Sequence, residues 1–178
     1  MRFSLLLLTL STLAFASPSR VQEECLGCSL DTTLLWPPNH NLVDVGLNLE
    51  EHGDPNATHT TTLQVFSDED DVWPASRQFS PDASQLCDRL RLRSERGGHG
   101  DGRVYLIIVT VLDTNLTTKI SHTHGCALSV VVPHDMSAAS IASVRAQAQA
   151  AEEYWAAYGA APSNYYLVGD GPMIGPKQ

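Results

Sequence analysis

The sequence predicts an all-β domain, an antiparallel β-sandwich of about seven short strands, followed by a single C-terminal α-helix. Apolar residues alternate with polar ones in several segments, which is typical of strands with one buried face. Clusters of Gly, Pro, Asn and Asp separate these segments, and no helical period interrupts them before residue 136. After that point an alanine-rich stretch places its apolar residues at helical spacing.

Individual strands are expected where alternation or β-branched content is clearest. Residues 42–50 alternate strictly, so one face of this strand is expected to be buried. Residues 104–112 are apolar at alternate positions on both faces and rich in β-branched side chains, as expected of a central strand. Further strands are expected at 29–35, 60–66, 72–79, 89–93 and 128–132.

The C-terminal part of the chain has a different character. Residues 137–158 predict an amphipathic helix, with Asp135 or Ser137 as its N-cap, that packs on the sandwich; a partner-binding helix is the alternative. Gly, Pro and Tyr dominate the rest of the chain, for which we expect little fixed structure. The expected organisation is a signal peptide at 1–16, a cysteine-containing segment at 17–28, the sandwich at 29–135, the helix at 136–158 and a flexible tail at 159–178.

The start of the chain has the features of a cleavable signal peptide. Arg2 precedes a short apolar run that ends in Ala14-Phe15-Ala16, the small-residue pattern of a cleavage site. The run is too short to span a bilayer, and no second run follows. We therefore expect a secreted, extracellular protein without membrane insertion.

The chain is acidic, with 11 Lys and Arg against 20 Asp and Glu and a formal net charge of −9. This balance argues against nucleic acid and anionic membranes as partners, since both are bound by positive charge. Asn56 and Asn115 each begin an Asn-x-Thr sequon. If the source is eukaryotic, both are candidate glycosylation sites.

Three linked motifs carry a resemblance to a known family. They are LWPPNHNLV at 35–43, LRSER running into GDGRVY at 92–105, and VVVPHD at 130–135. In this order they resemble an exported immunoglobulin-like module of the HYR/PKD-like kind, found mostly in bacterial proteins. The resemblance covers about residues 29–135 and implies an immunoglobulin-like fold with a supporting or adhesive role and no catalytic residues. The loop after 111–113 departs from the Gly-Asn turn that is usual in that family.

Immunoglobulin-like strand order would bring these motifs together at one pole of the sandwich. The simplest interpretation is a structural clasp, in which Arg103 pairs with a carboxylate while His40 and His134 bond loop carbonyls. The alternative is a Ca²⁺ or Zn²⁺ site that uses the histidines or nearby carboxylates. The acidic run 68–71 lacks the glycine and distal Glu of a calcium loop and is expected to be solvated. The residues expected at this pole are Trp36, His40, Asp101, Arg103, His134 and Asp135.

The opposite pole would collect loop histidines. His122 and His124 are expected on one face of a strand, where His52 or His59 could complete a Zn²⁺ site with them. An ordinary exposed pair of loops is the simpler interpretation.

The same pole would hold all four cysteines. An even number in an exported protein predicts two disulfides. The competing zinc interpretation has only the half-site Cys25-x-x-Cys28, because Cys87 and Cys126 are isolated. A bridge from Cys126 to either Cys25 or Cys28 fits the strand order, with Cys87 bonded to the other.

Sequence motifs for catalysis are missing: there is no G-x-S-x-G elbow, no H-E-x-x-H, no P-loop and no Rossmann fingerprint. We expect a secreted, non-enzymatic binding, adhesive or structural module that contacts an extracellular protein or polysaccharide and needs no cofactor. Trp36, Trp73 and Trp155 could stack on sugars, although Trp36 is expected to pack beneath its Pro-Pro turn. The alternative is a small exported metal-dependent hydrolase with a histidine and carboxylate site at one pole.

Overall fold

The computed structural model describes residues 27–49, 55–70, 79–86, 89–171 and 173–175. The described chain is rich in antiparallel strands and has one long helix in its C-terminal part, α1 (Ala138–Tyr158), as the sequence predicts. The strands are β1 (Cys28–Leu30), β2 (Leu42–Asp44), β3 (Leu47–Leu49), β4 (Ala57–Ser67), β5 (Ala83–Leu86), β6 (Arg89–Arg93), β7 (Gly102–Asn115), β8 (Ser121–Pro133) and β9 (Tyr166–Leu167).

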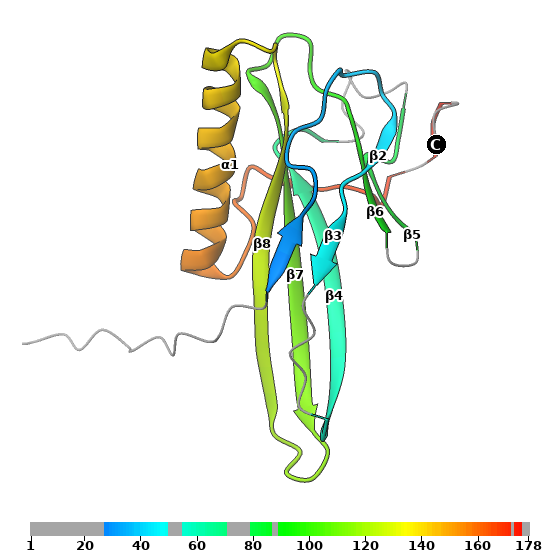
Figure 1. Ribbon diagram of the computed structural model, residues 1–178, viewed down its shortest axis with the longest axis vertical. Coiled ribbons are helices and arrows are strands. Elements are labelled where there is room, and N and C mark those ends of the chain that lie inside the picture. The colour runs from blue at the N-terminus through cyan, green and yellow to red at the C-terminus, as the bar shows by residue number, and fades with distance from the viewer. Residues whose placement is uncertain (1–26, 50–54, 71–78, 87–88, 172, 176–178) are drawn as a thin grey trace, which may run out of the picture.

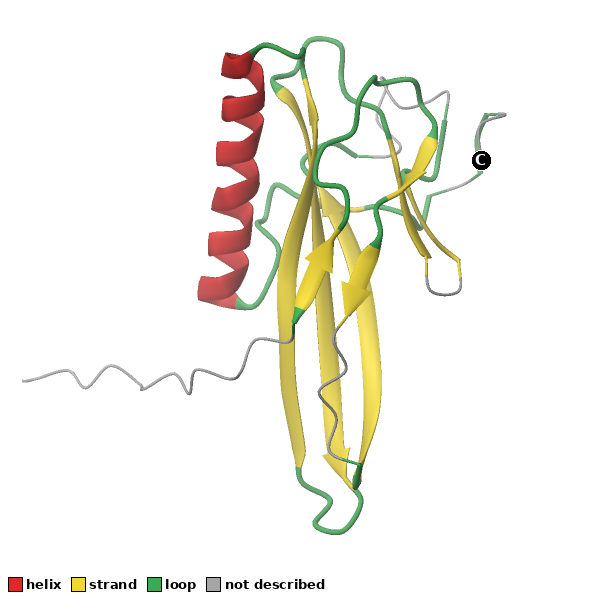
Figure 2. Cartoon of the chain, viewed as in Figure 1, coloured by secondary structure: helices red, strands yellow, loops and turns green. Residues whose placement is uncertain are grey.

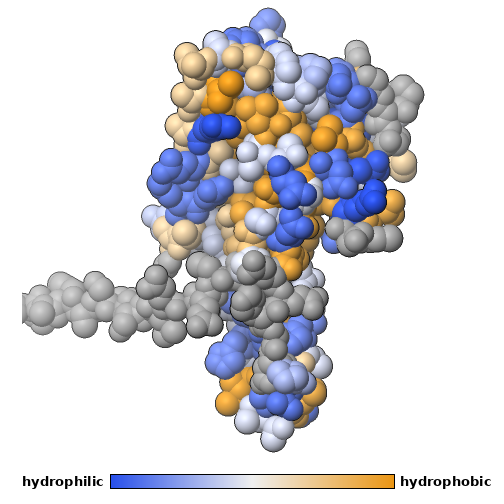
Figure 3. Space-filling view, in the orientation of Figure 1, coloured by the Kyte–Doolittle hydropathy of each residue, from blue (hydrophilic) through white to orange (hydrophobic). Residues whose placement is uncertain are grey.

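The described strands form three antiparallel sheets, with the orders β8-β7-β4-β9, β2-β6-β5 and β1-β3. Figure 1 shows β4, β7 and β8 running along the length of the molecule, with α1 beside their upper part and the smaller sheets on the other side. Beyond the level of the helix, the long strands continue as a narrow projection (Figure 2). Polar and apolar side chains intermingle on this projection in the space-filling view (Figure 3). We call its tip the lower end and the start of β7 the upper end.

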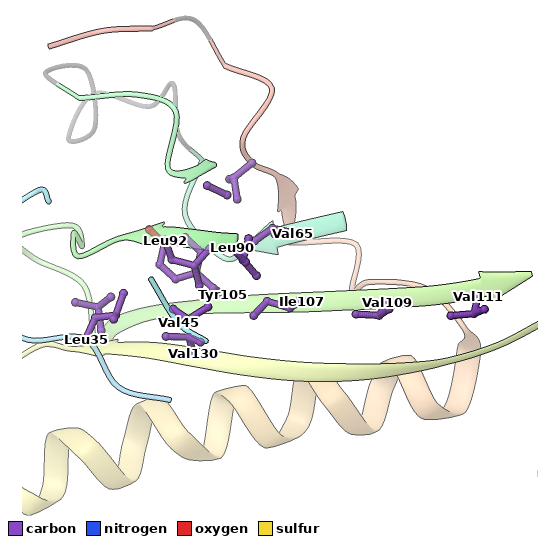
Figure 4. Packing of buried hydrophobic residues seen from close by; sticks show 13 residues of the cluster. Leu35, Val45, Val65, Leu90, Leu92, Tyr105, Ile107, Val109, Val111 and Val130 are labelled. Carbon is purple, nitrogen blue, oxygen red and sulfur yellow. The ribbon is translucent and has the colours of Figure 1, made fainter. Parts of the chain in front are cut away.

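Strand β7 is buried on both faces, which explains why the residues that point to either face are apolar. Ile107 and Val109 belong to the core that β7 shares with the smaller sheets, and Figure 4 shows them spaced along the strand. Leu106 and Ile108 point the other way and pack with Ala151 of α1. Each such side chain contributes roughly 1.5–3 kcal/mol by leaving water, so β7 anchors the core on both sides.

Helix α1 begins and ends with well-formed caps. Ser137 is the N-cap, and its side chain accepts a hydrogen bond from the Ser140 N–H at 3.2 Å. Asp135 lies outside the helix and accepts the Ser137 N–H at 2.7 Å. At the other end Gly159 has a φ of 69° and donates its N–H to the Trp155 carbonyl at 2.7 Å. Since residues on one face of α1 are buried against β7 and β8, the helix packs on the sheet as expected.

The strand predicted at 42–50 is wrong as a single element, because it divides into β2 and β3 in different sheets. The break falls at Gly46, which has a φ of 61°. This left-handed backbone conformation is unfavourable for any residue with a side chain. A side chain at this position would also clash with the side chain of Asp31. Strict alternation continues through the break, so the pattern could not locate it.

Other strand boundaries also differ from expectation. β1 is shorter than the strand predicted at 29–35, although Leu34 still forms an isolated bridge with Val131. β4, β7 and β8 extend further into the projection than predicted, because their lower ends are polar and hide the strand pattern. β5 was not predicted. The strand expected at 72–79 lies outside the described residues except for Phe79.

The expectation of a tail without fixed structure is wrong for several residues after 159. β9 pairs with the end of β4, where Phe66 faces Leu167. The next residue, Val168, is buried in the main core and donates its N–H to the Val65 carbonyl at 2.9 Å. Further on, Ile174 bridges Ser80. A few apolar residues thus fix the tail, too few to stand out from its Gly and Pro content.

Cys28 and Cys126 form a disulfide that joins β1 to β8 across 98 residues of sequence. This is one of the pairings expected from the sequence. Cys25 and Cys87 lie outside the described residues, so a second bridge stays a prediction, as does the signal peptide at 1–16.

Replacing both bridged cysteines, as Cys28→Ala with Cys126→Ala, should lower the free energy of unfolding by roughly 2–5 kcal/mol, because the unfolded chain loses a long closed loop. Urea denaturation followed by circular dichroism measures the change. Reductant should then destabilise the double variant less than it destabilises the native protein. Equal urea midpoints for the double variant and the oxidised native protein would contradict a stabilising bridge.

Candidate functional site

Four charged side chains meet inside the upper end of the protein. Arg93 ends β6, Arg103 lies near the start of β7, Asp82 precedes β5, and Glu95 lies between β6 and β7. Arg93, Arg103 and Asp82 have no exposed side-chain surface, and Glu95 is 2% exposed. We call these four residues the buried ionic cluster. Its formal charges cancel, as burial requires.

Ion pairs link the cluster. Arg103 Nη2 lies 2.6 Å from Asp82 Oδ2, and Arg93 Nε lies 3.2 Å from Asp82 Oδ1. Asp82 thus faces one guanidinium nitrogen from each arginine, and these two positive charges offset the burial of its carboxylate. The second carboxylate of the cluster is that of Glu95, whose Oε1 lies 3.9 Å from Arg103 Nη1.

The guanidinium groups also donate to uncharged groups of neighbouring loops. Arg93 donates from Nη2 to the Pro81 carbonyl at 2.7 Å and from Nη1 to the His40 carbonyl at 2.8 Å. Arg103 donates from Nε to Ser67 Oγ and from Nη2 to the Glu69 carbonyl, both at 2.8 Å. The two arginines therefore tie three separate segments, around His40, around Pro81 and at 67–69, to the ends of β6 and β7.

Tyr105 lies beneath the cluster. Its hydroxyl donates to the Arg93 carbonyl at 2.8 Å, and the Arg103 guanidinium carbon lies 4.7 Å from the centre of its ring. Burial raises the pKa of Tyr105 well above its usual value, which keeps the hydroxyl protonated as a donor. Burial alone would lower the pKa of Arg103, but the surrounding Tyr105, Asp82 and Glu69 outweigh it and raise that pKa.

His40 forms the exposed edge of this region. Its Nδ1 lies 2.6 Å from Glu95 Oε2, and its ring stacks on Phe79 with centroids 4.5 Å apart. Its side chain is 37% exposed, so it lies between the buried carboxylate and solvent. The sequence led us to expect a bond from His40 to a loop carbonyl; the structure gives it a carboxylate partner.

The other residues expected at this pole are placed around the cluster. Trp36 is 43% exposed, more than expected of a side chain packed beneath its Pro-Pro turn. Asp101 accepts a hydrogen bond from Gln147 of α1 at 3.0 Å. His134 and Asp135 lie in the turn that leads into α1, and the buried Nδ1 of His134 has no hydrogen-bond partner among the residues that the structure describes.

The acidic run after β4 is less solvated than we expected. Asp68 Oδ1 accepts the Val104 N–H at 2.9 Å, and the Glu69 carboxylate accepts the Gly97 N–H at 2.7 and 2.9 Å. Burial raises the pKa of Asp68 and of Glu69, although Arg103 and these N–H groups act in the opposite direction. Both carboxylates thus have structural partners.

Asp82 and Glu95 are the principal residues that sequence reasoning missed. A signal was present, since Arg93 and Arg103 stand beside apolar strand residues and a buried arginine needs a counter-ion. The spacing could not tell which carboxylates would serve, because Asp82 comes from a loop that looked like an ordinary turn.

Histidines gather around Asp113 near the lower end. His59 Nδ1 lies 2.6 Å from Asp113 Oδ1, and His124 Nδ1 lies 3.6 Å from Asp113 Oδ2. His122 faces Asp113 in the β7–β8 register, whereas His52 lies outside the described residues. Within the described ranges, no three His, Cys, Asp or Glu side chains are arranged to hold a metal ion. His40 and His134 are therefore not part of such a group either.

Both sequons lie at the lower end. Asn115 stands at the end of β7, and its Oδ1 accepts the N–H groups of Thr117 and Thr118 at 2.9 Å each. Asn56 precedes β4, and its carbonyl accepts the Leu116 N–H at 2.8 Å. The two asparagines are thus neighbours across the tip of the projection.

Comparisons with protein-family models, curated proteins and solved structures find no significant match to this chain. In the described part of the chain, no helix combines the length and the apolar character needed to cross a membrane.

Asp68→Asn should make the protein more stable at neutral pH. The pKa of the buried carboxyl is raised above its usual 3.8, so its ionisation disfavours the fold increasingly as pH rises through the folded-state pKa. Asparagine keeps an Oδ1 acceptor for Val104 and cannot ionise. Urea midpoints should therefore differ at neutral pH and converge below the usual pKa. The exposed Asp170→Asn is the matched control, and a variant less stable at neutral pH would contradict the interpretation.

Proposed function

We propose that the protein is an exported immunoglobulin-like module, without a catalytic role, that binds an extracellular polysaccharide. The observation that carries this proposal is the buried ionic cluster. The arginines and carboxylates of the cluster are buried and paired with one another, and His40 at the exposed edge is paired with the buried Glu95. Such a cluster supports a structural clasp, since acid–base catalysis requires groups within reach of the substrate.

The immunoglobulin-like class has support from the packing. The four-stranded sheet and the smaller sheets share one apolar core, to which β6, β7 and β8 all contribute. The family resemblance depends on the motifs at 35–43, 92–105 and 130–135, which meet at the upper end: Arg93 donates to the His40 carbonyl at 2.8 Å, and Arg96 donates to the Pro133 carbonyl at 3.2 Å. This convergence is what the proposed class would require.

Export is supported by the Cys28–Cys126 disulfide, because disulfides persist in oxidising compartments. The predicted signal peptide agrees with that compartment. If the exporting cell is eukaryotic, glycans on Asn56 and Asn115 would both stand at the lower end, away from the ionic cluster.

A binding role agrees with the exposed aromatic and apolar side chains of the described chain. Aromatic rings contribute large contact areas and stack on the apolar faces of sugars. Two are tyrosines of α1. The exposed large side chains include Trp36, Leu116, Ile120, Tyr154 and Tyr158.

The proposal is tested by a pull-down of the mature, oxidised protein on insoluble cellulose, chitin, β-1,3-glucan and cell-wall material, with and without EDTA. We expect retention on at least one neutral polysaccharide, unchanged by EDTA and without release of soluble sugar. Retention on none of them would overturn the binding function. EDTA-sensitive release of reducing sugar would overturn it in favour of the metal-dependent hydrolase.

A further inference from the structure

A cleft lies beside the C-terminal half of α1. After the helix the chain turns back and runs beside it before joining the sheet as β9 (Figure 1). The cleft between these segments has a volume of about 280 Å³, just below the usual range for small-molecule sites. Its side chains that can contact a ligand are Asp68, Gln147, Tyr154, Pro162, Asn164 and Tyr165.

Two tyrosines form the aromatic part of the cleft. Tyr154 is 38% exposed, and its ring lies 4.5 Å from that of Tyr158 one helical turn further on. Tyr165 is half-buried, since it also packs against the sheet with Leu106 and Ile108. Tyr154 therefore presents a ring to solvent, while Tyr165 is held in place by the core behind it.

Polar groups from three different segments complete the lining. Asp68 follows β4 and is fixed by the Val104 N–H at 2.9 Å. Gln147 of α1 is oriented by its 3.0 Å hydrogen bond to Asp101. Asn164 is exposed on the segment after the helix. A carboxylate and two carboxamides therefore stand around one aromatic surface, the first two already positioned by partners of their own.

This combination suits a sugar ring. Aromatic faces pack on the C–H face of a pyranose, and carboxylate and carboxamide groups exchange hydrogen bonds with its hydroxyls. Asp68 and the net charge of −9 disfavour acidic sugars. A second cavity of about 260 Å³ is formed by α1 with β1, β8 and neighbouring residues; none of the described residues that line it is aromatic, so it suits a sugar less well.

We propose that the cleft between α1 and the segment 162–165 binds an uncharged sugar unit of the polysaccharide, with Tyr154 as the stacking surface. Asp68, Gln147 and Asn164 bond the sugar hydroxyls. This inference rests on the proposed function and adds to it the place and the chemical class of the ligand.

Isothermal titration of the mature, oxidised protein with cellohexaose, chitohexaose and laminarihexaose tests the cleft. For the sugar that binds, Tyr154→Ala should raise Kd at least tenfold and Asn164→Ala several-fold. Tyr166→Ala is the matched control, because this tyrosine is also exposed but does not line the cleft; its Kd should stay within twofold. Urea midpoints identify any variant that is unstable.

Asp68→Asn gives an independent check, because we expect it to stabilise the fold while it weakens binding several-fold. If the native protein is retained on a polysaccharide but Tyr154→Ala and Asn164→Ala bind like the native protein, the cleft is wrong and the proposed function stands. If polygalacturonate binds better than the neutral sugars, the ligand class is wrong. If the native protein binds no polysaccharide, the proposed function fails together with the cleft.

Discussion

Two arginine side chains buried at the upper end impose the constraint on which the rest of the structure depends. A guanidinium that leaves water without a counter-charge is very costly, so Arg93 and Arg103 require carboxylates beside them. Asp82 and Glu95 meet that need from two different loops. A well-packed apolar replacement could be equally stable. What the charges add is a requirement of position, because each arginine can be buried only where these loops bring a carboxylate beside it.

The same constraint reaches the cleft beside α1. Arg103 donates to the Glu69 carbonyl, and the neighbouring Val104 N–H donates to the Asp68 carboxylate. These bonds hold the segment after β4 in place, and Asp68 lines the cleft. The buried ionic cluster therefore supports the proposed binding surface: the cluster fixes the backbone after β4, and that backbone presents the Asp68 side chain to the cleft.

Sequence patterns predicted the parts of the fold that depend on local periodicity. The apolar run of β7 and the Ser137 cap of α1 belong to this group, since burial and capping directly restrict which residue types can occur at those positions. Features that depend on contacts between distant parts of the chain produced no recognisable local sequence pattern. The change of sheet at Gly46 interrupts no alternation, and the choice of Asp82 as a counter-ion depends on where its loop folds. Among the residues expected at the upper pole, Arg103 was identifiable because a charge beside a buried strand is conspicuous.

The most direct measurement is a double-mutant cycle in urea with Asp82→Ala, Arg103→Met and their combination. If the buried ionic cluster is the constraint, each single substitution should lower the free energy of unfolding by about 3–5 kcal/mol, because it leaves a buried charge unpaired. The combined substitution should cost at least about 1 kcal/mol less than the sum of the two. Single effects below about 1 kcal/mol, as for exposed ion pairs, or additivity within about 0.5 kcal/mol, would contradict the central role of the cluster.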